Sequence, residues 1–174
     1  MDTSALEDFP PLQDVPAFAG HAPDQERPLG GYAAMMGLFF ALCAAFGRWL
    51  RASNLSLPDQ VETRDLVLIS VATHKMSRML AKDRVGSTIR APFTTFQGDA
   101  GHGEVDEAAR GRGLRRAIGE LLTCPYCLAM WISAGFLGGI VAFPRPTRLV
   151  ASAFAVVTGA DTLQIAYRKA EEQL

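Results

Sequence analysis

Apolar residues gather in separate runs along the chain, and polar segments lie between them. The clearest run covers residues 31–47, GYAAMMGLFFALCAAFG, which carries no charge and is followed by Arg48, Trp49 and Arg51. About 20 apolar residues cross the hydrocarbon core of a bilayer, and arginine and tryptophan side chains favour its interface. The pattern predicts a membrane-spanning helix over residues 31–50.

Two more apolar runs follow each other near the C-terminal end. Residues 126–143, YCLAMWISAGFLGGIVAF, form the first, and Pro144 and Pro146 are expected to end it. Residues 149–167 form the second, which a single acid, Asp161, interrupts. The short segment between the runs predicts a tight turn and therefore an antiparallel pair of membrane helices.

Residues 65–82 form a doubtful span. Their first half is apolar, but His74, Lys75 and Arg78 follow within the same stretch. Charged side chains are costly inside a bilayer, so this segment predicts either a fourth span or a short, partly embedded helix. The expected fold class is all-α: a polytopic helical membrane protein of three to four transmembrane helices with a long cytoplasmic loop.

The segments outside these runs are polar. Residues 1–30 hold five of the ten prolines and six acids against one base, which predicts a disordered acidic tail before a helical membrane domain at residues 31–174. Residues 83–113 are rich in glycine and charge and predict a loop, in which Pro92 weakens the β character of residues 87–96. The net charge of −1 gives no reason to expect nucleic-acid binding.

Small residues recur every four positions in the apolar runs. Such stripes let helices approach closely. They suit packing within one chain, a homo-oligomer or a larger membrane complex, and the rest of the apolar surface predicts contact with the lipid bilayer. The stripes are Ala33, Gly37, Ala41 and Ala45; Gly135 and Gly139; and Ala151, Ala155 and Gly159.

Lysine and arginine are unevenly divided between the two sides of the expected bundle. With four spans, the N-terminal tail, the loop at 78–122 and the C-terminal tail share one side and carry eleven of these residues, against five on the other side. In a bacterial inner membrane protein the more basic side faces the cytoplasm. Both termini and residues 124–127 are therefore predicted at the cytoplasmic face.

Two cysteines stand where the basic loop meets the second apolar run. They are Cys124 and Cys127, and Pro125 between them suits the first turn of a helix. A thiol at a helix N-terminus has a lowered pKa, so the pair is a candidate redox dithiol, with Cys124 as nucleophile and Cys127 as resolving thiol. Two thiolates also supply half of a tetrahedral metal site, or the side chains simply pack as small apolar groups.

Three more side chains are expected near the depth of the cysteine pair. His74 and Arg78 lie four residues apart and share a helix face, and Asp161 falls in the cytoplasmic half of its helix. His74 and Asp161 can complete a zinc or iron site with the two thiolates. Alternatively, Asp161 is an ion or proton site, or forms a structural pair with Arg78 or His74, and these two bases reach lipid head groups.

A further pattern combines isolated charged residues with the cysteine motif. It consists of Arg78, Asp83, Arg90, Pro92 and Phe93, then Gly119 to Leu122, Cys124, Pro125, Cys127 and Trp131, and finally Pro144 and Asp161. The pattern resembles a group of small bacterial membrane proteins known only as a domain of unknown function. The resemblance covers roughly residues 65–167, and its Cys-Pro-x-Cys-x-x-x-Trp core is the most specific part. It implies a bacterial integral membrane protein and brings no activity with it.

Two functions remain open at this point. The first is an accessory or structural membrane protein whose cysteine pair orders the cytoplasmic face, by binding a metal or a partner. The second is a membrane-bound thiol–disulfide redox protein that uses Cys124 and Cys127. In either case Arg90 and Phe93 either anchor the loop onto the bundle or onto lipid, or belong to an ordinary loop.

Overall fold

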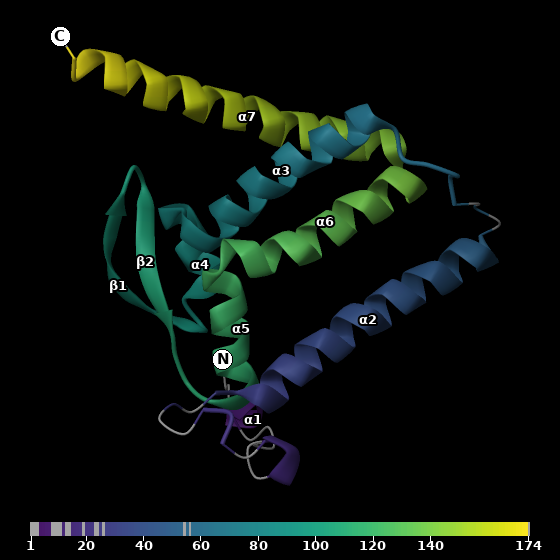
Figure 1. Ribbon diagram of the computed structural model, residues 1–174, viewed down its shortest axis with the longest axis vertical. Helices are drawn as coiled ribbons and strands as arrows, with labels where there is room; N and C mark the ends of the chain where they lie inside the picture. Colours follow the sequence, from purple (N-terminus) through teal and green to yellow (C-terminus); the bar gives the residue numbers. More distant parts are fainter. Residues whose placement is uncertain are drawn as a thin grey trace.

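The fold is mostly helical and includes one small sheet (Figure 1). The computed structural model describes residues 4–7, 12, 15–18, 20–22, 25, 27–53, 55 and 57–173. The helices are α1 (Ser4–Glu7), α2 (Leu29–Ala52), α3 (Thr63–Lys82), α4 (Ser87–Arg90), α5 (Gly113–Thr123), α6 (Pro125–Ala142) and α7 (Pro144–Glu171); the strands are β1 (Thr94–Gly101) and β2 (Glu104–Ala109); and 3-10 turns cover Pro16–Phe18 and Arg84–Gly86.

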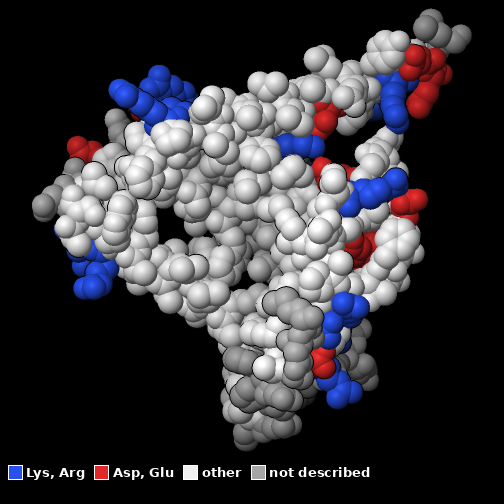
Figure 2. All heavy atoms as spheres, turned by 180° about the vertical axis from the view of Figure 1, so that it is seen from behind, with Lys and Arg blue, Asp and Glu red and all other residues white. Residues whose placement is uncertain are grey.

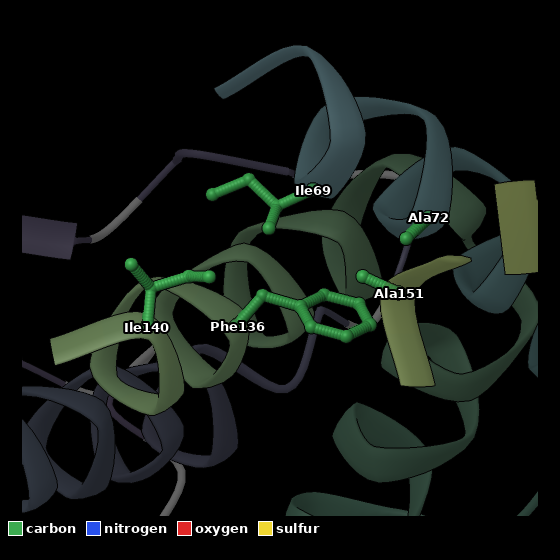
Figure 3. Close-up of a cluster of buried hydrophobic side chains, with 5 residues drawn as sticks. All are labelled: Ile69, Ala72, Phe136, Ile140 and Ala151. Atoms are coloured by element: carbon green, nitrogen blue, oxygen red, sulfur yellow. The ribbon is translucent and has the colours of Figure 1, made fainter. Parts of the chain in front are cut away.

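The hydrophobic core lies where α3 packs against both α6 and α7. Ile69 and Ala72 of α3 meet Phe136 and Ile140 of α6 and Ala151 of α7 (Figure 3). The two alanines are fully buried, and their small side chains let the three helices approach closely. Because these apolar positions recur at helical spacing, α3 has one face that belongs to the core even though its sequence is only partly apolar.

The join between α6 and α7 is shorter than the sequence predicted. Pro144 and Pro146 were expected in a turn, but they lie in the first turn of α7, and Phe143 alone separates the two helices. Proline is tolerated there because the first backbone N–H groups of a helix have no partner within it. Thr147 closes the corner by packing against Gly139, where an added Cβ would lie 2.6 Å from the Thr147 hydroxyl oxygen.

The all-α prediction is wrong in the segment between α3 and α6. Residues 94–101 and 104–109 pair as an antiparallel hairpin, and residues 87–90 are helical rather than extended. The turn of the hairpin is made by Gly101, His102 and Gly103, which all have a positive φ, the region that favours glycine. The glycine-rich composition was interpreted as a loop, whereas it supplies this turn.

The segment from residue 83 to residue 124, called here the loop region, is docked on the ends of three helices. Gly31 of α2 contacts Ala117 of α5 so closely that an added Cβ would lie 2.7 Å from the alanine Cβ. Nearby, the Tyr32 hydroxyl donates a hydrogen bond to the Glu120 carboxylate. The loop region is therefore a folded part of the molecule.

The predicted disordered tail at residues 1–30 falls largely outside the described residues. Within the described part, α1 is helical and Pro16–Phe18 form a 3-10 turn. The Glu7 carboxylate accepts a hydrogen bond of 2.7 Å from Arg115 of α5. These described positions therefore have defined contacts with the loop region.

Among the described residues, three helices are long and apolar enough to cross a membrane, by length and composition: α2, α6 and α7. Figure 2 shows few charged side chains across the middle of one face of the molecule and groups of them toward its left and right margins. The small-residue stripe on α2 is exposed along its length, and an added Cβ at Gly37 would meet nothing within 4 Å. On α7, by contrast, Ala151 is in the core and Gly159 faces open space.

Candidate functional site

The most deeply buried polar group of the loop region is the guanidinium of Arg90. Its Nε donates to Glu107 Oε2 at 3.0 Å and its Nη2 donates to Glu107 Oε1 at 3.1 Å. The side chains are 0% and 5% exposed, respectively. Because a buried ion pair needs further hydrogen bonds to offset the loss of water, the surroundings of this pair decide whether it is stable.

Those surroundings satisfy both partners. Arg90 also donates to the backbone carbonyls of Leu80 at 2.7 Å and Asp83 at 3.1 Å, which ties it to the end of α3. The Glu107 carboxylate accepts from the Ser87 hydroxyl at 2.5 Å and the Thr94 hydroxyl at 2.6 Å. Arg90 thus joins α3, α4 and the hairpin at one point.

The carboxyl of Glu107 titrates far from its ordinary range. Burial raises its pKa, but hydrogen bonds from Arg90, Ser87 and Thr94 and the charge of Arg90 together outweigh burial and bring the pKa to about 2. The negative charge is therefore kept at neutral pH. Val105 and Glu107 lie two residues apart and therefore share one face of a strand, and Val105 is buried. This spacing is the sequence feature that indicates a buried position for Glu107.

A polar cleft of about 810 Å³ lies between the end of α3, the hairpin turn and the second half of α7. Lys75 pairs with Asp161 at 2.8 Å, Arg78 makes two 2.8 Å hydrogen bonds to Glu104, and Arg168 lies 2.8 Å from His102. Asp161 therefore has the partner that an acid in an apolar helix needs. That partner is Lys75, not the predicted Arg78 or His74.

Asp83, which caps the end of α3, borders the same cleft. Burial raises the pKa of its carboxyl, and the carboxylates of Glu104 and Asp161 act in the same direction, against the opposite effect of Lys75. Four of the predicted site residues (His74, Arg78, Asp83 and Asp161) thus line one cleft. Two ion pairs cross it, Lys75 with Asp161 and Arg78 with Glu104.

Cys124 and Cys127 lie at the junction of α5 and α6 and are joined as a disulfide, with Cα atoms 5.3 Å apart. Cys124 is the N-cap of α6, and its sulfur accepts a hydrogen bond of 3.2 Å from the backbone N–H of Cys127. Cys127 is exposed and Cys124 is half-buried. The pair thus closes the first turn of α6, next to the last turn of α5.

The four predicted metal ligands do not form one site. The two cysteine sulfurs are bonded to each other, Asp161 is paired with Lys75, and His74 lines the polar cleft. Within the described ranges, no group of three or more His, Cys, Asp or Glu side chains could hold a metal ion. The shared depth that the sequence indicated does not bring these side chains together.

A second cleft, called here the α3–α6 groove, runs between one face of α3 and one face of α6 and has a volume of about 730 Å³. Its wall includes Thr73, whose hydroxyl is buried and has no hydrogen-bond partner among the described residues. His74 and Arg78 line both this groove and the polar cleft. Phe39 of α2 borders the groove and makes an edge contact with Trp131 of α6, with ring centroids 5.2 Å apart.

A second ion pair, which the sequence did not indicate, lies at the opposite end of α3. Arg148 donates to both carboxylate oxygens of Asp65, at 2.9 Å and 2.7 Å, and Asp65 is 2% exposed. Both residues lie near the starts of their helices; from the sequence, Asp65 was expected to begin the doubtful span and Arg148 to lie in the turn before the last apolar run. Only their position on packed helices shows that they meet.

Comparison with known proteins identifies a family without an assigned activity. The family model described as "Protein of unknown function (DUF1360)" matches residues 68–167. The "Sporulation protein YjcA" of Bacillus subtilis (strain 168) is 37% identical over 75 residues, which are 41% of this chain and 63% of that protein. The alignment therefore spans less than two thirds of the length of this curated relative. No solved structure matches.

Proposed function

Because the chain belongs to the DUF1360 family of proteins of unknown function, whose description assigns no activity, we propose a function from the geometry of the helices. The protein is an integral membrane protein of a bacterial inner membrane with four spans, α2, α3, α6 and α7. Its role is accessory: it holds the folded loop region at the cytoplasmic face, with the cysteine pair closing the first turn of α6, where α5 joins it.

The opposite directions in which successive helices run support this proposal. The start of α2 contacts the loop region through Gly31, whereas its end reaches the α6–α7 corner, where the Trp49 and Phe143 ring centroids are 6.2 Å apart. From there the chain must return to the loop region before α6 begins. It does so through α3, so if α2 and α6 cross a membrane, α3 crosses it too.

The dimensions and contacts of α3 fit this role. Its 20 residues extend about 30 Å, which equals the thickness of a hydrocarbon core. Its cations are neutralised within the protein: Lys75 by Asp161, Arg78 by Glu104 and Lys82 by Asp106. A helix too polar to face lipid on all sides can cross when neighbours cover its polar face, and α6 and α7 both pack on α3.

The proposed orientation follows from positive charge. The loop region and the end of α7 lie together, as the contact between His102 and Arg168 indicates, and they carry seven of the fourteen arginines. Basic segments close to membrane helices are retained in the cytoplasm. The opposite side carries the short segments around Asp59 and Phe143.

Single cysteines introduced at Asp59 and Ala100 are expected to label from opposite sides of the membrane. In a chain with Cys43, Cys124 and Cys127 changed to serine, an impermeant maleimide should react with Asp59→Cys in intact cells and with Ala100→Cys only after permeabilisation. Gln173→Cys is the matched control and should behave as Ala100→Cys does.

Two other outcomes would overturn parts of this proposal. Labelling of both sites from the same side means that α3 does not cross. Labelling of Ala100→Cys alone in intact cells keeps four spans but reverses the orientation, and it places the disulfide on the oxidising side.

A second candidate function, thiol–disulfide exchange, is favoured by the disulfide at the N-terminus of α6. In the reduced protein the Cys124 thiolate would attack the disulfide of a partner protein and release one partner thiolate. Cys127 would then attack the Cys124 sulfur and release the second, which leaves the partner reduced and the pair oxidised. The free backbone N–H groups at a helix N-terminus favour the negative charge of a thiolate placed there.

Alkylation rates test this candidate. With Cys43 changed to serine, Cys124 left alone in a Cys127→Ser background should react with iodoacetamide at pH 7 roughly ten times faster than glutathione does. The matched variant, with Cys124→Ser and Cys127 retained, should react more slowly. A Cys124 rate equal to that of glutathione would exclude an activated thiol and leave the pair a structural link.

A further inference from the structure

We propose that the α3–α6 groove is a binding site for one glycerophospholipid molecule. The proposal rests on the membrane location argued above, because only there does the groove face the lipid phase. The groove follows the length of two helices: its α3 side extends from Leu66 to Arg78. Twelve residues of helix correspond to about 18 Å along the helix axis.

The polarity of the groove changes along its length. At the end distant from the loop region, its wall is made by Leu66 and Ile69 of α3 and Leu137 of α6. At the end next to the loop region, it is made by His74, Ser77 and Arg78. A molecule that fills this space therefore has an apolar chain and a polar head, with the head directed toward the loop region.

Thr73 supplies the observation that indicates a ligand. The residue lines the groove, and its hydroxyl is buried and has no partner in the part of the chain that the structure describes. A buried hydroxyl without a partner is costly, and such groups usually bind a ligand or water. The nearby hydroxyls differ: Ser70 donates to the Leu66 carbonyl and Ser77 to the His74 carbonyl.

The spacing of the polar groups matches a glycerophospholipid. Thr73 lies five residues before Arg78, which is about 7.5 Å deeper along the helix. Glycerophospholipids carry ester carbonyls on the apolar side of their phosphate, so the Thr73 hydroxyl can donate to an ester carbonyl while the phosphate accepts from Arg78 and His74. Arg78 is held in place by Glu104 through Nε and Nη2, which leaves its Nη1 directed to other acceptors.

The position of the groove gives a lipid a path of entry. α2 touches α6 through a few aromatic contacts, among them Phe39 with Trp131. Figure 2 shows the molecule hollowed between α2 and the other helices, so a chain can enter from the side. Basic pockets between membrane helices near the cytoplasmic face are typical sites for lipid head groups.

Native mass spectrometry of the purified, delipidated protein tests the proposal. Phosphatidylglycerol should bind with one tight site, and Thr73→Val should weaken that site roughly five-fold, because one hydrogen bond to the ester carbonyl is lost. Thr162→Val is the matched control: its hydroxyl donates to the Thr158 carbonyl outside the groove, and its lipid affinity should not change. Ala129→Phe, which narrows the groove, should reduce binding more than ten-fold.

Stability without lipid separates binding from folding. Thr73→Val removes a buried hydroxyl that has no partner, so the delipidated variant should melt at the same temperature as the delipidated wild type, or higher. Phosphatidylcholine provides the same phosphate and ester groups and should also bind. Three results would overturn the proposal: a site that takes only a free fatty acid or a quinone, equal retention of lipid by Thr73→Val and Thr162→Val, or no tight site at all. If the cysteine labelling still showed four spans alongside any of these results, the membrane proposal would stand.

Discussion

Replacing Arg90 with methionine should destabilise the loop region by about 3–5 kcal/mol, the cost of breaking a buried ion pair by removing one partner. The change leaves the Glu107 carboxylate buried without its cation and the carbonyls of Leu80 and Asp83 without their donor. Hydrogen exchange measures this directly, because hairpin amides exchange when the hairpin opens. Exchange in β1 and β2 should accelerate roughly 100- to 4,000-fold.

Arg84→Met is the matched control. Arg84 also pairs with a hairpin acid, Asp99, at 2.9 Å, but both side chains are about two-thirds exposed. Surface pairs of this kind contribute about 0–1 kcal/mol, so exchange should change by less than about five-fold. If Arg90→Met behaved like Arg84→Met, the buried pair would not be what holds the hairpin on α3.

Acid should destabilise the folded protein through Glu107 as the pH falls from about 4.5 to about 2. The folded pKa of about 2 lies below the ordinary value of 4.5, so the charged carboxylate stabilises the fold at every pH above 4.5. This stabilisation is lost as the pH falls through that window, because the unfolded chain takes up the proton first. The difference between the folded and the ordinary pKa of Glu107 corresponds to about 3 kcal/mol of unfolding free energy, since one pKa unit is about 1.4 kcal/mol.

Thermal unfolding of the purified protein between pH 2 and pH 7 measures this loss. Glu107→Gln should melt lower at pH 7 and show a correspondingly smaller dependence on acid. Asp83 contributes with the opposite sign, because its raised pKa means that its protonation favours the folded state. The comparison of wild type with Glu107→Gln cancels that contribution. Equal acid dependence of the two proteins would contradict the role of Glu107.

Local features of the fold were predictable because local sequence decides them. The helical positions of the three apolar runs were confirmed as α2, α6 and α7, with ends that differ by a few residues. The largest shift is at the start of α7, where prolines interpreted as a turn belong to the helix. Proline can either end one helix or occupy the first turn of the next, and only the backbone hydrogen bonds show which of the two applies.

The candidate site was harder to predict because it depends on partners far apart in sequence. Asp161 was recognised as an acid that needs a cation, but the choice of Lys75 over Arg78 depends on how α3 and α7 are rotated about their axes. Glu107 was passed over, because an acid in a glycine-rich segment is usually solvated. It is buried here because Arg90 crosses from α4 to meet it.

The sequence by itself determined which segments are apolar enough to cross a membrane, where the cysteine pair begins a helix, and which segments carry the positive charge. Each of these properties depends only on residues that are close together in the sequence. The tertiary structure decided that α3 returns the chain across the bundle, that the loop region folds as a hairpin around Arg90, that Cys124 and Cys127 bond to each other, and that Asp161 pairs with Lys75. Those outcomes depend on which distant side chains meet, and the free energy of each contact exists only once the helices are packed.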